Sequence, residues 1–359
     1  MSRAEIEKIT TLPYAAWVEP ADERQIVLST RLRLARNLAG RPFPNRLQDA
    51  EADALAQEIC EQLRACEGSA AFEGWQVLRL DDLLQAEKGV LLEKHLLSRD
   101  ILQHPAGRRL VVNQAQSLAV MINEEDHLRM QAILPGLQLT AGWQQISALD
   151  DKLALGLNFA YDQQLGFLTS CPSNLGTGLR ASVMLHLPAL HLTNKLEGIF
   201  RQLPQVGLTV RGVYGEGSQS QSGLYQISNQ ITLGYSEEEI ISRLQQLVEE
   251  IIAQEVQARE WLRQNRLLWL QDRIGRAAGI LANACLLSSA EAMEHISILR
   301  LGLAMGLCQP SWQISWRELN LLMLSVQPPF LQAAASKELN EYERDEARAT
   351  LSRGFLGNK

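Results

Sequence analysis

The chain has 359 residues, of which 46% are hydrophobic and 21% charged, and its formal net charge is −7. These values are typical of a protein with a buried core; they exclude disordered and collagen-like chains and argue against a surface devoted to nucleic acid. The length predicts about two domains.

The cysteines and the N-terminus point to an intracellular protein. The five cysteines include no Cys-x-x-Cys pair, and the first residues lack the basic start and apolar run of a signal peptide. The longest uncharged stretches are broken by proline, asparagine and glutamine, so no membrane span is predicted. We therefore expect a cytoplasmic location.

Up to about residue 255, short strand-like runs alternate with helical segments. The runs expected to form strands are 77–80, 109–113, 118–122, 166–169, 182–187, 206–214 and 224–233. From Ser236 the pattern changes, because Glu237 to Glu239 form an acidic first turn and apolar residues follow at helical spacing. We predict a domain of mixed helices and strands over residues 1–255 and an all-helical C-terminal domain over residues 256–359.

Arginine supplies most of the positive charge, because only seven of the 34 basic residues are lysine. Guanidinium groups bind phosphate oxygens in pairs and stay charged at physiological pH. Two arginines spaced two residues apart in an extended segment should point the same way. One polyphosphate site is thus one interpretation of the following five residues, and scattered surface arginines are the other: Arg31, Arg33, Arg129, Arg180 and Arg211.

Three adjacent acids within residues 123–127 directly follow the apolar run 118–122. Placed at the end of a buried strand, they could hold a cation. The alternative is the acidic N-terminus of a helix, because Leu128, Ile133 and Leu134 follow at plausible helical spacing.

A polar, glycine-containing loop lies within residues 169–182, between two predicted strands, and Cys171 stands where it opens. A cysteine near cations has a lowered pKa, and its partial thiolate could hold a guanidinium group. The alternative is an ordinary small buried residue.

Four motifs in this order closely resemble the phosphagen (guanidino) kinases, and among them the bacterial enzymes that phosphorylate arginine in proteins. They are Ser-x-Arg-x-Arg at 29–33, Asn-Glu-Glu-Asp-His at 123–127, Thr-Ser-Cys-Pro-x-Asn-Leu-Gly-Thr-Gly-x-Arg-Ala-Ser at 169–182, and Arg-Gly-x-Tyr-Gly-Glu-Gly at 211–217. The resemblance implies an α+β catalytic domain, with an antiparallel sheet flanked by helices. It also implies ATP as the phosphoryl donor, with Mg²⁺ bridging its phosphates.

Position by position, the resemblance implies roles for individual residues. Glu125 is the catalytic carboxylate, which orients the target guanidinium and accepts its proton, while Glu216 is a second substrate carboxylate and Cys171 a thiolate beside the guanidine. The ATP site is lined by Ser29, Thr30, Arg31, Leu32, Arg33, His95, Arg129, Arg180, Ala181, Ser182, Val183, Met184, Arg211, Gly212, Val213, Tyr214, Gly215 and Glu216.

Two departures bear on the acceptor. The kinases of free arginine carry a glutamate where Gln219 stands, and a helical domain precedes their first motif, whereas only 28 residues precede Ser29 here. Both differences predict an open site suited to arginine on a protein surface. The alternatives are a free-arginine phosphagen kinase and a non-catalytic adaptor that binds phosphoarginine.

The C-terminal segment carries a further motif. Arg344 and Arg348 share one face of a predicted helix and could clamp a phosphate, while Asp345 could accept hydrogen bonds from phosphoarginine; the alternative is a solvated charged helix. Together with Ala349, these residues resemble the family's phosphoarginine-binding motif, which implies allosteric feedback.

The partners are implied by the resemblance alone. They are protein substrates with exposed arginines, a zinc-binding activator protein, a Clp ATPase and protease that degrade marked proteins, and a heat-shock repressor. The resemblance further implies a homodimer and a role in stress response and protein quality control.

Overall fold

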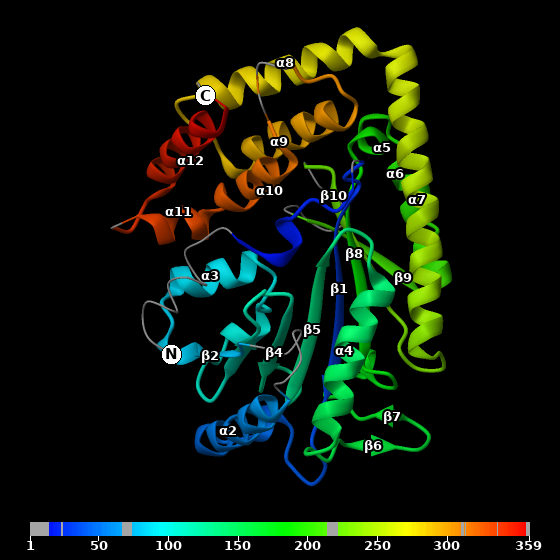
Figure 1. Cartoon of the computed structure of the whole chain (residues 1–359), viewed down its shortest axis with the longest axis vertical. Coiled ribbons are helices and arrows are strands. Elements are labelled where there is room, and N and C mark those ends of the chain that lie inside the picture. Colours follow the sequence, from blue (N-terminus) through cyan, green and yellow to red (C-terminus); the bar gives the residue numbers. More distant parts are fainter. Residues whose placement is uncertain are drawn as a thin grey trace.

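The structure is a computed structural model that describes residues 14–22, 24–66, 74–213, 222–309, 312, 314–335 and 337–356. Within these residues, eight strands form one antiparallel sheet in the order β2-β3-β4-β5-β1-β8-β10-β9 (Figure 1), as the resemblance implied. The strands are β1 (Val27–Arg36), β2 (Gln76–Arg79), β3 (Arg109–Val112), β4 (Leu118–Ile122), β5 (Leu128–Pro135), β8 (Leu179–His186), β9 (Leu208–Gly212) and β10 (Leu224–Asn229). A short hairpin, β6 (Tyr161–Asp162) and β7 (Gly166–Phe167), stands apart from this sheet.

The strand that follows the acidic motif corrects one interpretation of the sequence. Residues 128–135 form β5, so the helix considered for this segment is wrong. Six of the eight residues of β5 are buried. A strand covered on both faces shows a nearly continuous apolar run, which spacing alone does not distinguish from a short buried helix.

Helices flank the sheet. Those of the first part are α2 (Asp49–Ala65), α3 (Gln85–Glu93), α4 (Leu139–Ala154), α5 (Pro188–Leu192) and α6 (Leu196–Phe200). Helix α4 packs against β1 and β5, where a side chain at Gly142 would meet Leu32 Cδ1 at 2.5 Å. A glycine therefore lets this helix lie close to the sheet.

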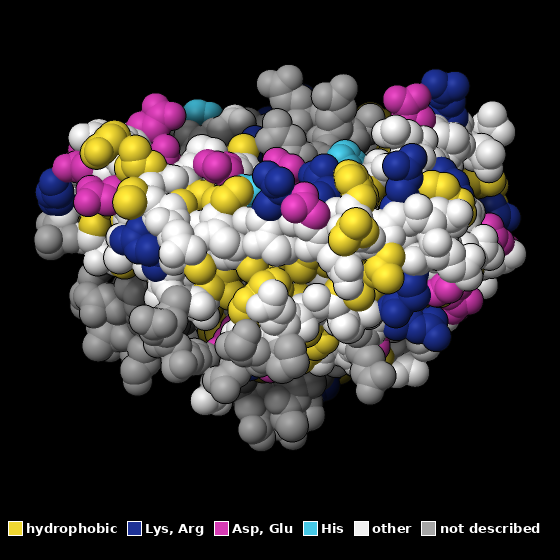
Figure 2. Space-filling model, turned by 90° about the horizontal axis from the view of Figure 1, so that it is seen from above, with side chains coloured by type: hydrophobic (Ala, Val, Ile, Leu, Met, Phe, Trp, Pro, Cys, Tyr) yellow, Lys and Arg dark blue, Asp and Glu magenta, His cyan; other side chains and the backbone are white. Residues whose placement is uncertain are grey.

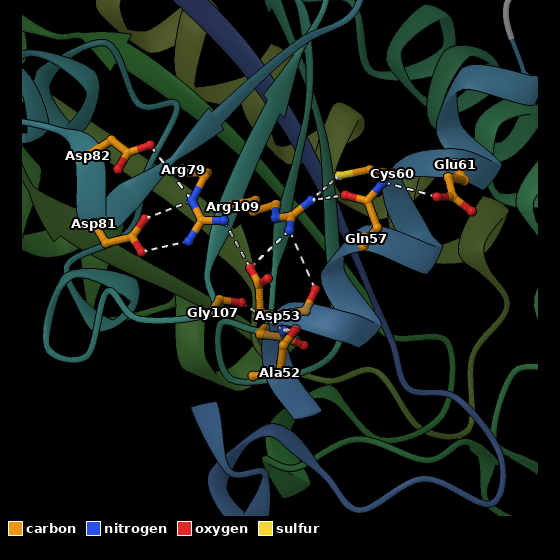
Figure 3. Close-up of polar contacts among 11 residues, drawn as sticks. Ala52, Asp53, Gln57, Cys60, Glu61, Arg79, Asp81, Asp82, Gly107 and Arg109 are labelled. Carbon is orange, nitrogen blue, oxygen red and sulfur yellow. Dashed lines mark hydrogen bonds and ion pairs between the residues drawn. The ribbon is translucent and has the colours of Figure 1, made fainter. Parts of the chain in front are cut away.

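Ion pairs and hydrogen bonds connect α2 to β2 and β3 (Figure 3). Asp53 Oδ1 accepts from Arg109 Nη2 at 2.9 Å and lies 3.3 Å from Arg79 Nη1. Arg109 is only 6% exposed, and its Nη1 also donates to Gln57 Oε1 at 2.8 Å. This network fixes the beginning of α2 beside the loop that enters β3.

The second part of the chain is helical. It contains α7 (Glu237–Asn265), α8 (Leu267–Asn283), α9 (Ser289–Ala304), α10 (Trp316–Ser325), α11 (Pro328–Ala334) and α12 (Glu341–Leu356). Ser236 Oγ accepts from Glu239 N, and the Glu239 carboxylate accepts from Ser236 N, so α7 begins where the capping pattern predicts. The predicted domain boundary at residues 255 and 256 lies within α7, which runs beside the sheet toward the helices above it (Figure 1).

Seen from above, hydrophobic side chains lie among charged ones on the surface (Figure 2). The exposed apolar side chains of the chain include Leu268, 81% exposed, and Trp261, 43% exposed. Across the described ranges, no helix is both long and apolar enough to span a membrane.

Candidate active site

A cleft of about 300 Å³ lies over one face of the sheet and contains all five arginines that the sequence singles out. It also contains Glu125 and Cys171. Its lining residues are Arg31, Arg33, Ser98, Asp100, Glu125, Arg129, Cys171, Ser173, Asn174, Arg180, Arg211, Gln226 and Ser228. The interpretation of the arginines as scattered surface residues is therefore wrong.

The register of the sheet explains why these arginines converge. Arg31 and Arg33 are two apart on β1, and Arg33 lies opposite Arg180 on β8. On the other side of β1, Arg129 of β5 pairs with Ala35, which is two residues beyond Arg33. Residues opposite one another, or two apart, share one face of a sheet. Arg211 joins them from β9, where it pairs with Gln226 of β10.

Burial and crowding disfavour the charge on three of the guanidinium groups, those of Arg31, Arg33 and Arg180. Burial, with Arg129 and Arg180 nearby, lowers the pKa of Arg31 to about 10. Burial and the neighbouring arginines lower the pKa of Arg33 further and that of Arg180 to a lesser extent. The buried Nε atoms of Arg33 and Arg180 have no hydrogen-bond partner within the described part of the chain. An anion with several oxygens would compensate these charges and accept hydrogen bonds from the unpaired Nε groups.

Glu124 and Arg129 form an ion pair at the end of the cleft. Arg129 Nη1 lies 2.6 Å from each carboxylate oxygen of Glu124, and Ser98 Oγ donates to the same carboxylate. Burial alone would raise the pKa of Glu124, but Arg129 and these hydrogen bonds outweigh it and hold that pKa below its usual value. Glu124 is therefore ionised and paired with Arg129.

Glu125 is in a different environment, although it is the next residue. Its carboxylate lines the cleft, and Asn174 Nδ2 lies 3.4 Å from its Oε2. Burial, together with the adjacent Asp126, raises the pKa of Glu125, and Arg129 opposes this only in part. The Glu125 carboxylate is thus more basic than a solvated one and is available to a ligand in the cleft.

Two buried side chains hold the acidic loop in place. Asn123 has a positive φ of 58°, and its Nδ2 donates to Ala52 O at 2.8 Å and Gly107 O at 3.0 Å. Asp126 Oδ1 accepts from Asn37 Nδ2 at 2.6 Å and from Ser170 N at 2.7 Å. Because Ser170 immediately precedes Cys171, Asp126 fixes the position of the cysteine loop relative to Glu125.

Cys171 stands at the mouth of this loop, as the sequence predicts. Its Sγ lies 3.0 Å from Ser173 Oγ, and the cysteine is close enough to Arg180 to favour the charge on that guanidinium. The thiol therefore faces a site that contains both cations and the Glu125 carboxylate.

Several residues expected at the ATP site point their side chains into the core instead. Leu32, Ala181 and Val183 are fully buried, and Thr30 Oγ1 donates to Gly136 O at 2.7 Å. They alternate along β1 and β8 with the residues that line the cleft, so their side chains lie on the opposite face of the sheet. Ser29, Ser182 and Met184 lie on the same face of the sheet as the lining residues, but their side chains are buried.

His95 lies beside the cleft rather than in its lining. Its ring centroid is 5.6 Å from that of Trp17, and burial, with Arg31 and Arg33 nearby, lowers its pKa to about 3. The imidazole is therefore neutral at physiological pH. Of the other predicted residues, Gly212 ends β9 and Val213 follows it, while Tyr214, Gly215, Glu216 and Gln219 lie outside the described residues.

The tail motif lies on α12, and its two arginines differ in their environment. Arg348 is 2% exposed, and it donates to Val326 O at 2.8 Å, Leu287 O at 2.5 Å and Asp345 Oδ1 at 2.5 Å. Arg344 is only partly buried and donates to Leu339 O at 2.8 Å. Ala349 is buried. Arg348 thus holds α12 against its neighbours, while Arg344 and Asp345 remain accessible to solvent.

Four residues of the cleft lie outside the motifs that the sequence singles out: Ser98, Asp100, Gln226 and Ser228. Ser173 and Asn174 belong to the motif at 169–182, which assigned them no individual role. Gln226 and Ser228 alternate with Ile227 on β10, and this polar alternation on a predicted strand was a usable signal. Ser98 and Asp100 lie in a connection without such a pattern. In the described part of the chain, no group of three or more His, Cys, Asp or Glu side chains could hold a metal ion.

Two family descriptions match successive parts of the chain. "ATP:guanido phosphotransferase, C-terminal catalytic domain" matches residues 55–258, and "Protein-arginine kinase McsB C-terminal domain" matches residues 268–359. The protein-arginine kinase of Moorella thermoacetica is 44% identical over 344 residues, which cover 95% of this chain and 97% of that protein. That of Pelotomaculum thermopropionicum is 42% identical over 346 residues, 96% of each chain.

Solved structures show the same fold. The substrate-free duplicated taurocyamine kinase from Schistosoma mansoni has a TM-score of 0.58 at 26% identity, covering 78% of this chain and 44% of that chain. Lombricine kinase has a TM-score of 0.56 at 26% identity, covering 70% of this chain and 75% of that chain. Both are similar to this chain in the arrangement of sheet and helices.

Proposed function

Because this chain belongs to the protein-arginine kinases, within the ATP:guanido phosphotransferase family, we propose that it transfers the γ-phosphoryl group of ATP to the guanidinium of arginine side chains in proteins. Its place in the family makes it a kinase. The acceptor and the roles of its residues are the proposal.

One observation carries the assignment of the site. A single cleft brings five guanidinium groups together with a carboxylate, Glu125, whose pKa is raised. The guanidiniums suit the phosphates of ATP, because the half-buried, crowded charges of Arg31, Arg33 and Arg180 would gain from an anion. They would also stabilise the charge that develops on the transferring phosphoryl group.

The acceptor guanidinium is proposed to bind beside Glu125 and Cys171. An arginine side chain must lose a proton before one of its nitrogens can attack phosphorus, and its pKa lies above about 12. A carboxylate within hydrogen-bond reach can orient the group and take that proton as the new N–P bond forms. The raised pKa of Glu125 favours this step.

Mg²⁺ is proposed to enter on the nucleotide. The cleft offers the five arginines and the acids Glu125 and Asp100, a set better suited to phosphate than to a protein-bound metal. A magnesium ion bridging the phosphates would neutralise negative charge during transfer.

The further roles rest on the resemblance of the sequence to its family. We propose that Arg344 and Asp345 bind phosphoarginine and that Arg348 supports them through its contacts in the core. Protein substrates with exposed arginines, a zinc-binding activator, a Clp ATPase and protease, a heat-shock repressor and a second copy of the chain are the proposed partners. Cytoplasmic location, stress response and allosteric feedback by phosphoarginine belong to the same proposal.

Mass spectrometry of the products tests the reaction. The protein would be incubated with Mg·ATP and either an unfolded protein substrate or free arginine, and products would be analysed without acid, because the N–P bond is acid-labile. Phosphorylation on protein arginines, lost in Glu125→Ala, is expected. Modification of free arginine alone would indicate a phosphagen kinase. Binding of phosphoarginine without any transfer, even with an activator present, would indicate an adaptor.

A further inference from the structure

Two buried arginines lie away from the cleft, where the sheet joins the helical part of the chain. Arg259 lies on α7 and Arg300 on α9, and they are 8% and 1% exposed. Between the same elements lies His186 at the end of β8, whose Nε2 is 2.8 Å from Ser297 Oγ of α9. The hydrogen bonds place the three groups in one buried region. Glu255, the partner of Arg259, accepts from Ala189 N, three residues after His186, and Ser297, which contacts His186, lies one helical turn before Arg300. Consistent with this, Arg259 disfavours the charge on Arg300, and both disfavour a charge on His186.

The hydrogen bonds of the two guanidiniums are incomplete. Arg259 donates through Nε to Glu255 Oε1 at 2.9 Å and through Nη1 to Arg24 O at 3.0 Å. Arg300 donates through Nη1 to Asn320 Oδ1. Arg259 Nη2, Arg300 Nε and Arg300 Nη2 are buried and lack any hydrogen-bond partner among the residues that the structure describes. Buried N–H groups in native proteins are nearly always paired.

The charges are also unbalanced. Glu255, which is fully buried, is the carboxylate that pairs with Arg259, and its oxygens also accept from Ala189 N at 3.1 Å and Leu190 N at 2.9 Å. In the described part of the chain Arg300 has no carboxylate within ion-pair distance; its Cζ lies 5.3 Å from the centroid of the Trp316 ring, which is a neutral group. His186 is neutral, since burial and the arginines hold its pKa well below the usual value. One positive charge is left without a counter-charge, and such burial is unfavourable unless an anion compensates it.

We propose that Arg259 and Arg300 together hold a small monovalent anion of the size of chloride. Three unpaired N–H groups from two helices supply the donors, and one negative charge balances the region. The ion would tie α7 to α9 at the base of the helical part, independently of the ATP cleft on the sheet.

Bromide, which replaces chloride and scatters anomalously, tests the site on the unaltered protein. Crystals of the full chain soaked in sodium bromide are expected to show an anomalous peak within hydrogen-bond distance of Arg259 Nη2 and Arg300. Peaks confined to other places, or a water molecule in that position, would overturn the proposal.

Thermal unfolding supplies the second test. With Mg·ADP saturating the cleft, replacing sodium gluconate by sodium chloride at constant ionic strength should raise the Tm by about 2–4 °C and then saturate. Arg300→Gln should abolish this increment. Arg317→Gln, which removes an exposed arginine of α10 paired with Glu19, should retain it. Equal Tm values in the two salts, or an unchanged increment in Arg300→Gln, would contradict the assignment.

Discussion

Arg129 Nη1 lies 2.6 Å from both carboxylate oxygens of Glu124, and this ion pair gives two adjacent glutamates different pKa values. Glu124 has a pKa below its usual value, whereas the pKa of Glu125 is raised. Adjacent residues of the same type thus differ in their environment: Glu124 pairs with an arginine of the cleft, and Glu125 remains available to a ligand there.

Replacing Glu125 tests that division. In Glu125→Gln, phosphorylation of a protein substrate should fall by about 10²- to 10⁴-fold, because an amide cannot accept the proton of the attacking nitrogen. Affinity for Mg·ATP, measured by calorimetric titration, should change much less. Glu197→Gln alters a solvent-exposed glutamate of α6 and should behave like the parent. A Glu125→Gln protein that keeps the parental rate would show that Glu125 is not the base.

Removing one crowded guanidinium should affect stability and binding in opposite directions. Arg33 is half-buried in the cleft, and both its burial and the neighbouring arginines disfavour its charge. Without nucleotide, Arg33→Gln should unfold at a higher Tm than the parent. Its affinity for Mg·ATP should nevertheless fall about tenfold to a hundredfold, the usual worth of a hydrogen bond to a charged group. Arg41→Gln, which alters an exposed arginine paired with Glu58, is the matched control. A lower Tm in nucleotide-free Arg33→Gln would contradict the repulsion argument.

The neutral imidazole of His95 predicts a pH dependence of stability. Its folded pKa of about 3 lies below the usual 6.5, so between these values the unfolded chain binds the proton and the folded chain does not. The free energy of unfolding should therefore fall as pH decreases from 6.5 toward 3. In His95→Asn this fall should be less steep, and asparagine tolerates the positive φ of 61°.

Denaturant unfolding at several pH values measures the effect of His95. His104→Asn, which alters an exposed histidine, should keep the parental slope. An identical slope in His95→Asn and the parent would mean that this imidazole is protonated in the folded protein.

Of the two arginines of α12, Arg348 should contribute mainly to stability and Arg344 mainly to ligand binding. Arg348→Ala leaves Val326 O and Leu287 O without their buried donor, and we expect a loss of about 3 kcal/mol in the free energy of unfolding. Arg344→Ala should change stability by less than about 1 kcal/mol, because its side chain is partly exposed. If α12 binds phosphoarginine, Arg344→Ala should weaken that binding in a calorimetric titration while the protein stays folded. Equal binding by Arg344→Ala and the parent would remove Arg344 from the proposed site.

Local residues determine some elements of the fold, whereas contacts between distant segments determine others. Strand β4 has the bounds that its apolar run predicts, and α7 begins at its capping box, because local residues determine both features. Strand β5 was not distinguishable from a helix, since it is buried on both faces. The convergence of Arg31 and Arg33 follows from alternation along one strand. The position of Arg180 opposite Arg33 depends on pairing between distant strands, which no local pattern encodes.

The buried hydrogen bonds that hold the acidic loop could not be predicted from the sequence either, because they also join distant segments. Asp126 belongs to a motif that the sequence singles out, but its partners Asn37 and Ser170 come from two other segments. Their proximity is a property of the folded sheet. By contrast, motifs shared with a known family suggested Glu125 and Cys171 directly, and both line the cleft.

The continuity of α7 has a practical consequence for dissecting the protein. At 29 residues this helix is about 43 Å long, and Glu255 and Ala258, near its middle, are fully buried. An N-terminal fragment ending at residue 255 would lose Ala258, Arg259 and Leu262 and would cut the helix through its packed section. A fragment expected to remain soluble should therefore retain α7 to Asn265, and a complementary piece should begin with α8 at Leu267.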